Sequence, residues 1–409
     1  MNWTTAVPTT TQVAFGSTSQ LGQTSPLNAN MTTAHSVSLS GLSPSTTYFF
    51  QTLSQNAAGT VEASHVFTVT TNAFGLNPAP LAHGWTLLSG TLQDVCPPNT
   101  AAYAFTDNCR NVVAAWSGGI ADIARNRLIV WGGGHTDYYG NEVYALGLSD
   151  EIMDRLNNPS PIANPNAGQT VLADGTPNSR HTYGALAYIA HADRMFVFGG
   201  APAGNVGFAS NDTWTLDLAS LTWQQMKADS TTQTASNSGA MADYDPVTRT
   251  VFLHDLDSFW QYTLETNTYT ALNFATSSVI SDQNNGVIDP KRRLFFILGD
   301  GFKAISIASG SDFALQDWSL QVVGCDALMT NSYPGLAYDP VIDRIVGWTG
   351  GNSVTVFNPD TKSCTTATAP NGPASPQLDG THGRFRYMPG FDAFLLENDA
   401  ETPAFIFKF

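Results

Sequence analysis

Positive charge is scarce in this sequence and unevenly placed. The 409 residues include 17 Lys and Arg against 33 Asp and Glu, which gives a formal net charge of −16. None of the 17 lies within residues 1–72. Because nucleic-acid binding needs a basic surface that neutralises phosphates, nucleic acid is not expected as a partner.

Long apolar runs are also missing. No stretch approaches the roughly 18 apolar residues that would cross a bilayer, so no transmembrane segment is predicted. No secretory signal peptide is recognisable at the N-terminus either. We expect an extracellular, secreted protein, and we interpret the sequence as one that has lost its export signal.

Cysteine is rare, and none of the four cysteines forms the CxxC pair typical of metal sites. Cys96 and Cys109 flank a short loop, and Cys325 and Cys364 lie near the ends of successive repeats. We hypothesise the disulfides Cys96–Cys109 and Cys325–Cys364, which would imply an oxidising compartment. The alternative is four unpaired buried thiols.

What the sequence does contain is typical of an all-β protein. Charged residues make up only 12%, whereas Gly (35) and Pro (22) are abundant and short apolar runs alternate with Thr, Ser and Asn. The length is enough for two domains. We predict domains over residues 1–72 and 73–409.

Residues 1–72 alternate apolar and polar residues in short runs, which indicates an antiparallel β-sandwich. The stretch from Leu42 to Phe50 (LSPSTTYFF), followed by Asn56-Ala57-Ala58-Gly59, resembles the fibronectin type III family. That resemblance implies a spacer or adhesive module. His35 and His65 are interpreted as ordinary strand residues.

One pattern recurs six times after residue 110. The pattern is a strand of small residues, a tight turn that often contains Asp-Pro, an Arg, an apolar strand and then Gly-Gly or an equivalent, and the copy at 384–398 is a weaker one. The copies lie at residues 118–134, 184–200, 239–255, 286–300, 335–351 and 384–398. Their spacing of roughly 45–65 residues is that of four-stranded propeller blades.

The recurring Arg is interpreted as structural. It occupies positions Arg127, Arg194, Arg249, Arg293 and Arg344, beside a turn that carries an Asp. There a guanidinium can bind turn carbonyls and a carboxylate. Repetition in successive blades favours a packing role.

The double glycine and the Trp or Tyr of the later strands resemble the Kelch-repeat, galactose-oxidase-like β-propeller family. The implied fold is an N-terminal fibronectin-III-like β-sandwich followed by a six- or seven-bladed β-propeller. Residues Gly84 to Leu88 could supply the outer strand of the last blade and close the ring.

Blade topology places the Asp-Pro turns on one face and the Gly-Gly loops on the other. The Gly-Gly face collects histidines, arginines and tyrosines from the last, first and second blades. We predict catalytic roles for His135, Arg180, His181, Tyr183 and His382, and substrate-binding roles for Tyr138, Tyr139, Asn141 and Arg384. His254, Asp255, Asp300 and Glu397 fall on the same rim in other blades. Convergence of such groups on a rigid scaffold is typical of a site.

These residue types suit β-elimination on a uronate-containing polysaccharide. His and Tyr can act as base and acid, and Arg can bind the substrate carboxylate. We therefore expect a carbohydrate-directed protein, with a polysaccharide lyase as the candidate enzyme and a polysaccharide or cell-surface glycan as partner. The acidic net charge opposes an anionic substrate.

Three alternatives stay open. His135 and Asp137, with His181 or His382, could hold a divalent metal ion as cofactor, although the spacing matches no strong motif. A copper radical oxidase resembles this chain in propeller type only, and it needs a Cys–Tyr cross-link that paired cysteines would not provide. The last alternative is a non-catalytic glycan- or protein-binding module. Metal ligands, substrate and oligomeric state are not fixed by the sequence.

Overall fold

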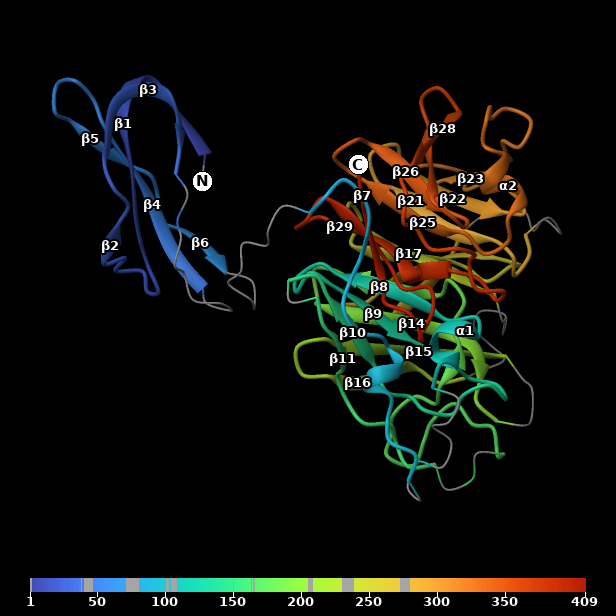
Figure 1. Ribbon diagram of the computed structural model, residues 1–409. Helices are drawn as coiled ribbons and strands as arrows, with labels where there is room; N and C mark the ends of the chain where they lie inside the picture. The colour runs from blue at the N-terminus through green and yellow to red at the C-terminus, as the bar shows by residue number, and fades with distance from the viewer. Residues whose placement is uncertain are drawn as a thin grey trace. The chain divides into compact units, whose positions relative to one another are not determined.

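The chain forms two compact units, Met1–Ala79 and Pro80–Phe409. The computed structural model describes residues 2–37, 39, 47–70, 81–100, 103, 109–149, 151–162, 164, 166–204, 209–229, 239–272 and 280–409 (Figure 1). Almost all regular structure is strand, so the all-β class is confirmed. Within these ranges no helix is long and apolar enough to cross a bilayer.

The first unit contains six antiparallel strands. They are β1 (Asn2–Gly16), β2 (Gln23–Thr24), β3 (Asn28–Ser36), β4 (Thr47–Gln55), β5 (Val61–Ala63) and β6 (Phe67–Thr70). The long β1 pairs with β3 near its start and with β2 and β4 near its end. Of the fibronectin-like motif, Leu42 to Thr46 lie outside the described residues. Asn56 begins a turn, since its Oδ1 accepts hydrogen bonds from the amides of Ala58 and Thr60.

The two histidines of the first unit differ. His35 is a buried strand residue whose ring contacts the hydroxyls of Thr5 and Thr11 and stacks on Trp3 at 4.9 Å. His65 is exposed and lies between β5 and β6, outside the strands. The strand interpretation therefore holds for His35 alone.

The second unit is built from six antiparallel four-stranded sheets, each of which runs from an inner strand to an outer one. The first is β8 (Gly118–Asp122), β9 (Arg127–Trp131), β10 (Tyr144–Gly147) and β11 (Met153–Arg155). The second is β13 (Leu186–Ile189), β14 (Arg194–Pro202), β15 (Ser210–Asp217) and β16 (Thr222–Lys227), and the short β12 (Arg180–His181) pairs with the end of β14. The third is β17 (Met241–Asp245), β18 (Thr250–His254), β19 (Phe259–Thr263) and β20 (Thr268–Ala271).

The remaining three sheets follow the same plan. The fourth is β21 (Asn285–Asp289), β22 (Leu294–Gly299), β23 (Gly301–Ser306) and β24 (Leu315–Asp317). The fifth is β25 (Gly335–Asp339), β26 (Arg344–Trp348), β27 (Ser353–Asn358) and β28 (Ser363–Thr368). The sixth is β29 (Phe385–Met388), β30 (Ala393–Leu396), β31 (Phe405–Lys408) and β7 (Gly84–Leu87). Short helical turns are η1 (Gln93–Val95), α1 (Asn111–Ala114), α2 (Asp326–Thr330) and η3 (His382–Arg384).

The six sheets close into a ring, the arrangement of a β-propeller. Each inner strand contacts the inner strand of the next sheet, and β29 of the sixth sheet contacts β8 of the first (Figure 1). The sixth sheet takes its outer strand from the start of the unit, where Trp85 pairs with Phe407. The predicted closure is thus confirmed, and the part of the chain that the structure describes contains six blades rather than seven.

The apolar core is divided between the sheets. Six buried clusters occur, one between each pair of neighbouring sheets, including the pair that closes the ring. There Leu128 and Val130 of the first sheet pack with Leu395 and Ile406 of the sixth. Since each sheet buries both of its faces, its strands are apolar on both sides. This packing fixes the inner strands on which the central residues stand.

Both predicted disulfides are present. Cys96–Cys109 joins the end of η1 to the residues before α1, and Cys325–Cys364 joins the start of α2 to β28. Each therefore fixes a segment outside the strand ladders to the ring. Such bonds persist in oxidising compartments.

The ring has two chemically distinct faces. The turns between first and second strands carry Pro246, Pro290, Pro340 and Pro389 and form the proline face. The segments that lead into the inner strands, with those that leave the second strands, carry His135, His181 and His382 and form the histidine face. Antiparallel pairing puts these two sets at opposite ends of the inner strands.

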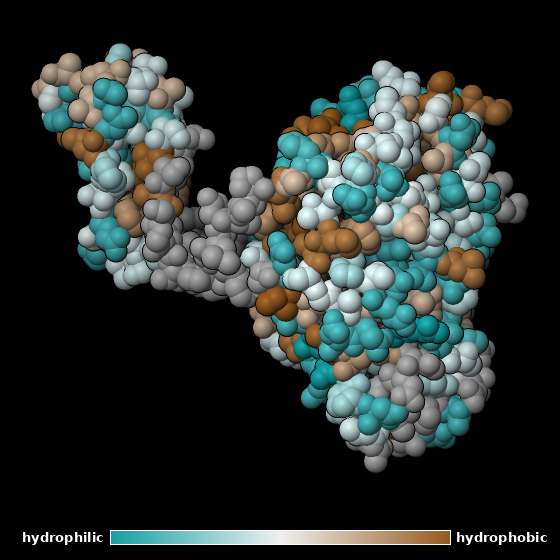
Figure 2. All heavy atoms as spheres, viewed as in Figure 1, coloured by the Kyte–Doolittle hydropathy of each residue, from teal (hydrophilic) through white to brown (hydrophobic). Residues whose placement is uncertain are grey.

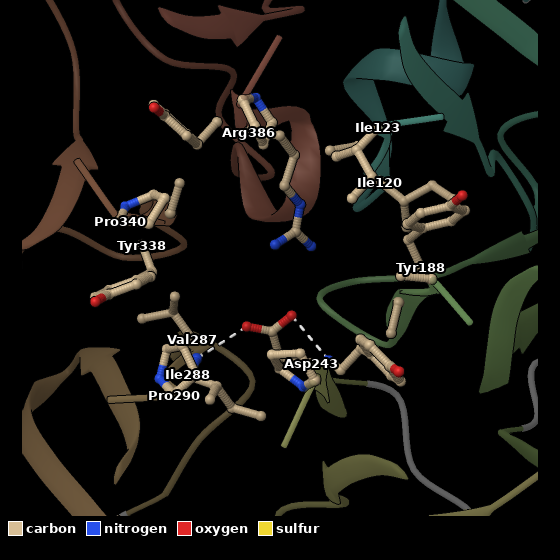
Figure 3. Close-up of a pocket in the computed structure, with 18 residues that line it drawn as sticks. Ile120, Ile123, Tyr188, Asp243, Val287, Ile288, Pro290, Tyr338, Pro340 and Arg386 are labelled. Atoms are coloured by element: carbon tan, nitrogen blue, oxygen red, sulfur yellow. Dashed lines mark hydrogen bonds between the residues drawn. The ribbon is translucent and has the colours of Figure 1, made fainter. Parts of the chain in front are cut away.

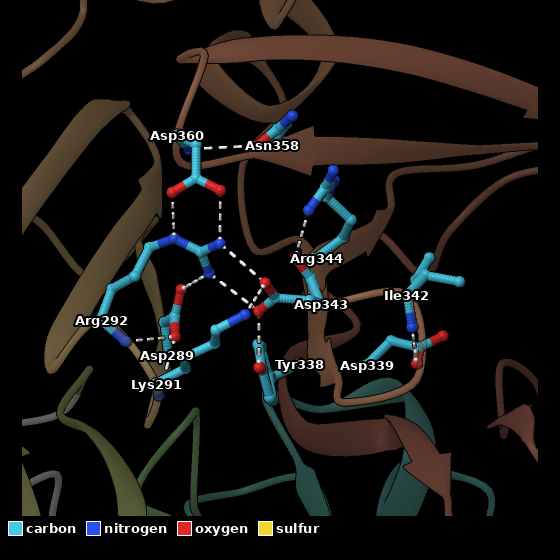
Figure 4. A network of polar contacts seen from close by, with 10 residues as sticks. All are labelled: Asp289, Lys291, Arg292, Tyr338, Asp339, Ile342, Asp343, Arg344, Asn358 and Asp360. Carbon is cyan, nitrogen blue, oxygen red and sulfur yellow. Dashed lines mark hydrogen bonds and ion pairs between the residues drawn. The ribbon is translucent and has the colours of Figure 1, made fainter.

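On the proline face, ion pairs connect neighbouring sheets. Arg292, in the turn after β21, binds Asp343 of the fifth sheet's turn at 2.8 Å and Asp360 at 2.7 Å (Figure 4). It also binds the buried Asp289 at 2.8 Å. Arg293 of the recurring Arg column likewise reaches Asp245 of the third sheet. The structural interpretation of the column agrees with these bonds.

The visible surface of the second unit is mainly hydrophilic. Figure 2 shows hydrophobic residues in small groups among hydrophilic ones. Exposed large apolar side chains such as Leu320, Leu378 and Val247 are separate in the sequence and lie in loops. Scattered apolar residues of this kind are ordinary for a protein surface.

Candidate functional site

The centre of the histidine face is occupied by rings from four different sheets. The turn residue of each repeat is the first residue after its inner strand, namely Ile123, Ala190, Pro246, Pro290, Pro340 or Pro389. The four rings lie seven residues before the turn residues of the first, second, fifth and sixth repeats, at Trp116, Tyr183, Tyr333 and His382. All four have left-handed backbones, with φ of 42°, 48°, 54° and 46°. Non-glycine residues rarely adopt this conformation, and it persists where the surroundings enforce it. Four equivalent positions thus share one unusual conformation.

These rings contact one another across the axis of the ring of sheets. The centroids of Trp116 and Tyr183 are 6.4 Å apart, those of Tyr183 and His382 5.7 Å, and those of His382 and Tyr333 5.2 Å. Backbone bonds support them, because the amide of Tyr183 donates to the carbonyl of Trp116 at 2.7 Å. The "aromatic cluster" below means Trp116, Tyr183, Tyr333 and His382.

An Asp–His pair lies beside this cluster. His181 Nε2 is 2.8 Å from Asp137 Oδ2, and the His181 ring lies 4.9 Å from Trp116 and 6.2 Å from Tyr183. His135, also left-handed at φ 43°, is 5.7 Å from His181. The His181 side chain is 6% exposed and that of Asp137 is 33% exposed, so solvent reaches the pair through the carboxylate.

Local sequence explains how His181 reaches this position. The short β12 pairs His181 with Ala201 at the end of β14, beyond the four-stranded part of the sheet. Gly134 lies against this strand with φ of 76°, and a Cβ there would approach the backbone of Arg180 to 2.3 Å. Only glycine therefore lets the loop that carries His135 and Asp137 pack onto β12.

Arg180 is enclosed by protein. Its guanidinium binds Asp212 at 2.6 Å, both side chains are 0% exposed, and further bonds reach the carbonyls of Gly199 and Asn178. Trp214 donates to the same carboxylate. Arg180 is thus the first residue of β12, and its buried side chain anchors the backbone next to His181.

Arg384 is enclosed in a similar way. It is 0% exposed and donates to the carbonyls of Ser117, Glu397 and Gly380. These bonds connect three loops around the aromatic cluster. Glu397 is equally buried, and burial raises its pKa to about 8 although the nearby Arg384 guanidinium acts to lower it. Arg384 therefore orders the loops around His382.

The predicted substrate-binding residues of the 132–142 loop separate into two groups. Tyr138 is fully buried and donates to Glu142 at 2.5 Å, while Asn141 is buried and bonded to Ser160 and Thr176. Tyr139 is half-buried, and burial together with the charge of Asp137 raises its pKa. Tyr139 is thus the member of this set that stands nearest to solvent.

Electrostatics around the aromatic cluster are acidic. Burial and the negative charge of Asp137 raise the pKa of Asp379, and Asp282 faces Tyr333, whose pKa burial also raises. Burial lowers the pKa of His382 to about 3, so this imidazole is neutral at physiological pH. His382 and Tyr183 are buried, so Trp116 and Tyr333 are the partly exposed rings of the cluster. Beside them His181 is held in one orientation by Asp137.

The other rim residues bond within their own loops. His254 is fully buried, and burial lowers its pKa to about 3; the amide of Leu256 donates to its Nδ1. Asp255 accepts hydrogen bonds from the Ser258 amide and the Trp260 indole. Across the described ranges, no group of three or more His, Cys, Asp or Glu is arranged to hold a metal ion.

Sequence reasoning placed His135, His181, Tyr183 and His382 on one face, and the structure brings these four together. It did not single out Trp116 and Tyr333, which complete the aromatic cluster. A signal for both existed, because each lies at the Tyr183 position of its own repeat. Aligning the repeats on their turns would have revealed that column.

Comparison with known proteins gives partial structural matches at 11–12% identity and TM-scores below 0.5. No protein-family model matches the chain, and no curated protein does. Among solved structures, an auxiliary nutrient binding protein from Bacteroides thetaiotaomicron is 11% identical with a TM-score of 0.46, covering 97% of this chain and 90% of that one. The extracellular domain of a putative hybrid two-component system from the same organism is 11% identical with a TM-score of 0.42 over 90% of this chain and 37% of that one. A fungal alcohol oxidase of the AA5 family, in complex with copper, is 12% identical with a TM-score of 0.38 over 88% and 66%.

Proposed function

We propose that this chain is an extracellular carbohydrate-binding β-propeller of the Kelch type, carried with a fibronectin-III-like spacer. The ligand would bind at the aromatic cluster. The observation that carries this proposal is the convergence of Trp116, Tyr183, Tyr333 and His382 on the axis, beside the partly exposed carboxylate of Asp137. Apolar ring faces with a few convergent polar groups are typical of small-ligand sites.

The chemistry of the site favours neutral or basic sugars over uronates. Asp137, Asp282 and Asp379 face it, and carboxylates accept hydrogen bonds from sugar hydroxyls or pair with amino groups. Arg180 and Arg384, which could have bound a uronate, have buried protein partners instead. An anionic polymer would meet repulsion from the net charge of −16 as well.

The secreted location is supported by covalent structure. Two disulfides are formed, which is characteristic of oxidising compartments such as the cell exterior. In this proposal the propeller is the rigid scaffold, and the loops on its histidine face would bind the extracellular ligand.

A lyase is the second candidate, and the Asp137–His181 pair is what favours it. Held by Asp137 at 2.8 Å, His181 could remove a proton next to a uronate carboxylate. Tyr183, in edge contact with His181, would protonate the leaving oxygen. Asp379, whose pKa is raised, would have to donate a hydrogen bond to the substrate carboxylate in place of an arginine.

Binding calorimetry with a polysaccharide panel tests the proposal. The panel should include neutral, amino-sugar and uronate polymers, each with and without chelator. We expect neutral or amino-sugar polymers to bind, and Trp116→Ala to weaken the binding about tenfold, as the loss of a stacking ring does. Arg110→Ala is the matched control, because Arg110 is 63% exposed and forms only a loose pair with Glu401.

The two candidates give different results. Release of unsaturated uronate, followed by ultraviolet absorbance and abolished in His181→Gln, would establish the lyase instead. Loss of either activity with chelator would identify a divalent metal cofactor. Absence of binding to every polymer would refute the carbohydrate proposal.

A further inference from the structure

A cavity opens on the proline face, at the opposite end of the inner strands from the aromatic cluster. It encloses about 320 Å³ (Figure 3). The inner strands and turns of all six sheets line it, through pairs such as Ile120 with Ala121 and Asp243 with Tyr244. Sites for small molecules start at about this volume.

The wall of this cavity is repetitive and rigid. Tyr188, Tyr244, Tyr338 and Tyr387 lie two residues before the turn residue of their repeats, and prolines follow in four of the turns. The hydroxyls of Tyr338 and Tyr387 donate to Asp343 and Asp392, each at 2.8 Å. Because their hydroxyls are bonded in this way, the rings present apolar surface along the wall.

Two charged residues interrupt the otherwise apolar lining. Three residues before the turn residue, four repeats carry Ile120, Ala187, Val287 and Ala337, whereas the third and sixth carry Asp243 and Arg386. In a ring of six sheets the third and sixth are opposite each other. Figure 3 shows the Arg386 guanidinium directed toward the Asp243 carboxylate across the cavity.

These two side chains do not neutralise each other directly. Among the described residues no ion pair within 4.0 Å joins them. Arg386 binds the carbonyls of Gly119 and Gly383 through Nε, which leaves both terminal nitrogens directed at the cavity. Within the part of the chain that the structure describes, Asp243 accepts hydrogen bonds from backbone amides only, those of Tyr244 and Ile288.

Such an arrangement is unfavourable when nothing lies between the charges. Burial raises the pKa of Asp243 and lowers the pKa of Arg386, although both residues stay partly exposed and neither charge touches a counter-charge. A molecule that carries both an anionic and a cationic group can pair with Arg386 and Asp243 at once. An apolar residue at both positions, as in the other four repeats, would have avoided the free-energy cost of placing these charges without a contacting counter-charge.

We propose that the cavity binds a small zwitterion of the α-amino acid class with an apolar side chain. Its carboxylate would pair with the terminal nitrogens of Arg386 and its ammonium group with Asp243. The side chain would pack against the tyrosine and proline wall. This site is independent of the carbohydrate proposal, because it uses the other end of the ring and different residues.

Calorimetry and thermal unfolding with free leucine and phenylalanine test the site. N-acetyl-leucine, which lacks the cation, and leucinamide, which lacks the anion, are the matched ligands. We expect saturable binding of the free amino acids, at least tenfold tighter than of either derivative. Lys291→Gln is the control variant, since Lys291 is on the same face, 65% exposed and outside the cavity lining.

Two variants test which residue binds each charged group of the ligand. Arg386→Gln should weaken leucine binding at least tenfold, and Asp243→Asn should remove the preference for leucine over N-acetyl-leucine. Absence of binding by either free amino acid to the wild-type protein at millimolar concentration would overturn the proposal. Equal affinity for leucine and both derivatives would overturn it too. Neither variant should alter polysaccharide binding at the aromatic cluster.

Discussion

The two faces of the ring are held together by different chemistry. On the proline face, partly exposed ion pairs run from sheet to sheet, such as those of Arg292 with Asp343 and Asp360. On the histidine face, a fully buried ion pair and a set of neutral rings hold the loops. The ion pairs of the proline face share charge among several partners with access to solvent, whereas the Arg180–Asp212 ion pair of the histidine face is fully enclosed.

This difference predicts distinct responses to substitution and to pH. A shared network loses one of several bonds when a residue is changed, but an enclosed pair loses its counter-charge. Carboxylates paired with arginine respond to acid below about pH 4, whereas buried neutral histidines respond from about pH 6.5 downward. The histidine face is therefore expected to be the weaker end in mild acid.

Breaking the enclosed pair should have the largest effect. Arg180→Ala leaves Asp212 buried without its counter-charge, and we expect a loss of about 3–5 kcal/mol in the free energy of unfolding. Chemical denaturation measures it, with Arg110→Ala as the exposed control. A loss no larger than that of the control would show that the pair does not hold the histidine face.

Removing the central arginine of the network should cost less. Arg292→Gln deprives the buried Asp289 of one charged partner, although that carboxylate keeps backbone amides of Lys291 and residue 292. We expect a loss of roughly 2–3 kcal/mol, the value of hydrogen bonds to charged groups. If the free energy of unfolding fell as much as in Arg180→Ala, the shared network and the enclosed ion pair would not differ in the way proposed.

The pH dependence separates the faces without removing their ion pairs. His382 has a folded pKa of about 3, below its unfolded value near 6.5, so its neutral form stabilises fully above pH 6.5 and this stability is lost as pH falls. Between pH 6.5 and 5 the loss reaches about 2 kcal/mol, at about 1.4 per pH unit.

Denaturation curves of His382→Gln across this range provide the measurement. The variant should lose less stability than the wild type between pH 6.5 and 5. The Arg292 guanidinium holds the pKa of Asp343 well below its usual range, so Asp343→Asn should change only the region below about pH 4. Identical curves for the wild type and His382→Gln above pH 5 would contradict the assignment.

The smallest effect is expected at the rim of the network. Asp360 is 63% exposed, so Asp360→Asn should leave the melting temperature almost unchanged at physiological salt. Lowering the salt concentration should reveal a small difference, because screening is then reduced. A large drop in melting temperature would mean that this exposed pair behaves like the buried one.

Much of the fold was predictable because the same sequence pattern recurs in each repeat and marks where its strands and turns lie. The Asp-Pro turns, the arginines beside them and the Gly-Gly loops fix strand order, and the apolar start at Gly84 indicated the closing strand. The contacts between individual side chains could not be predicted from this pattern. Arg180 is enclosed by Asp212, and Arg384 by backbone carbonyls such as those of Ser117 and Glu397. These partners come from distant parts of the sequence, so the residues next to either arginine do not indicate them.

At the aromatic cluster, too, the contacts between side chains could not be predicted from the sequence. His181 was predicted from the convergence of loops from three neighbouring blades on one face, but its orientation depends on Asp137, whose loop packs against β12 at Gly134. The metal and cofactor hypotheses stay predictions for the experiments above. Residues at one position of a repeat were more informative than residues adjacent in the chain.

The pairing of β7 with β31 has a consequence for how the protein is made. Leu87 and Phe405 are partners although roughly three hundred residues separate them. At a synthesis rate of about 5–20 residues per second, β7 waits for tens of seconds before its partner leaves the ribosome. During that time Trp85 has no sheet to join, and the first and sixth blades cannot lock. The ring is thus completed in a single late event, and a ribosome-bound chain should stay protease-sensitive until the final strand emerges.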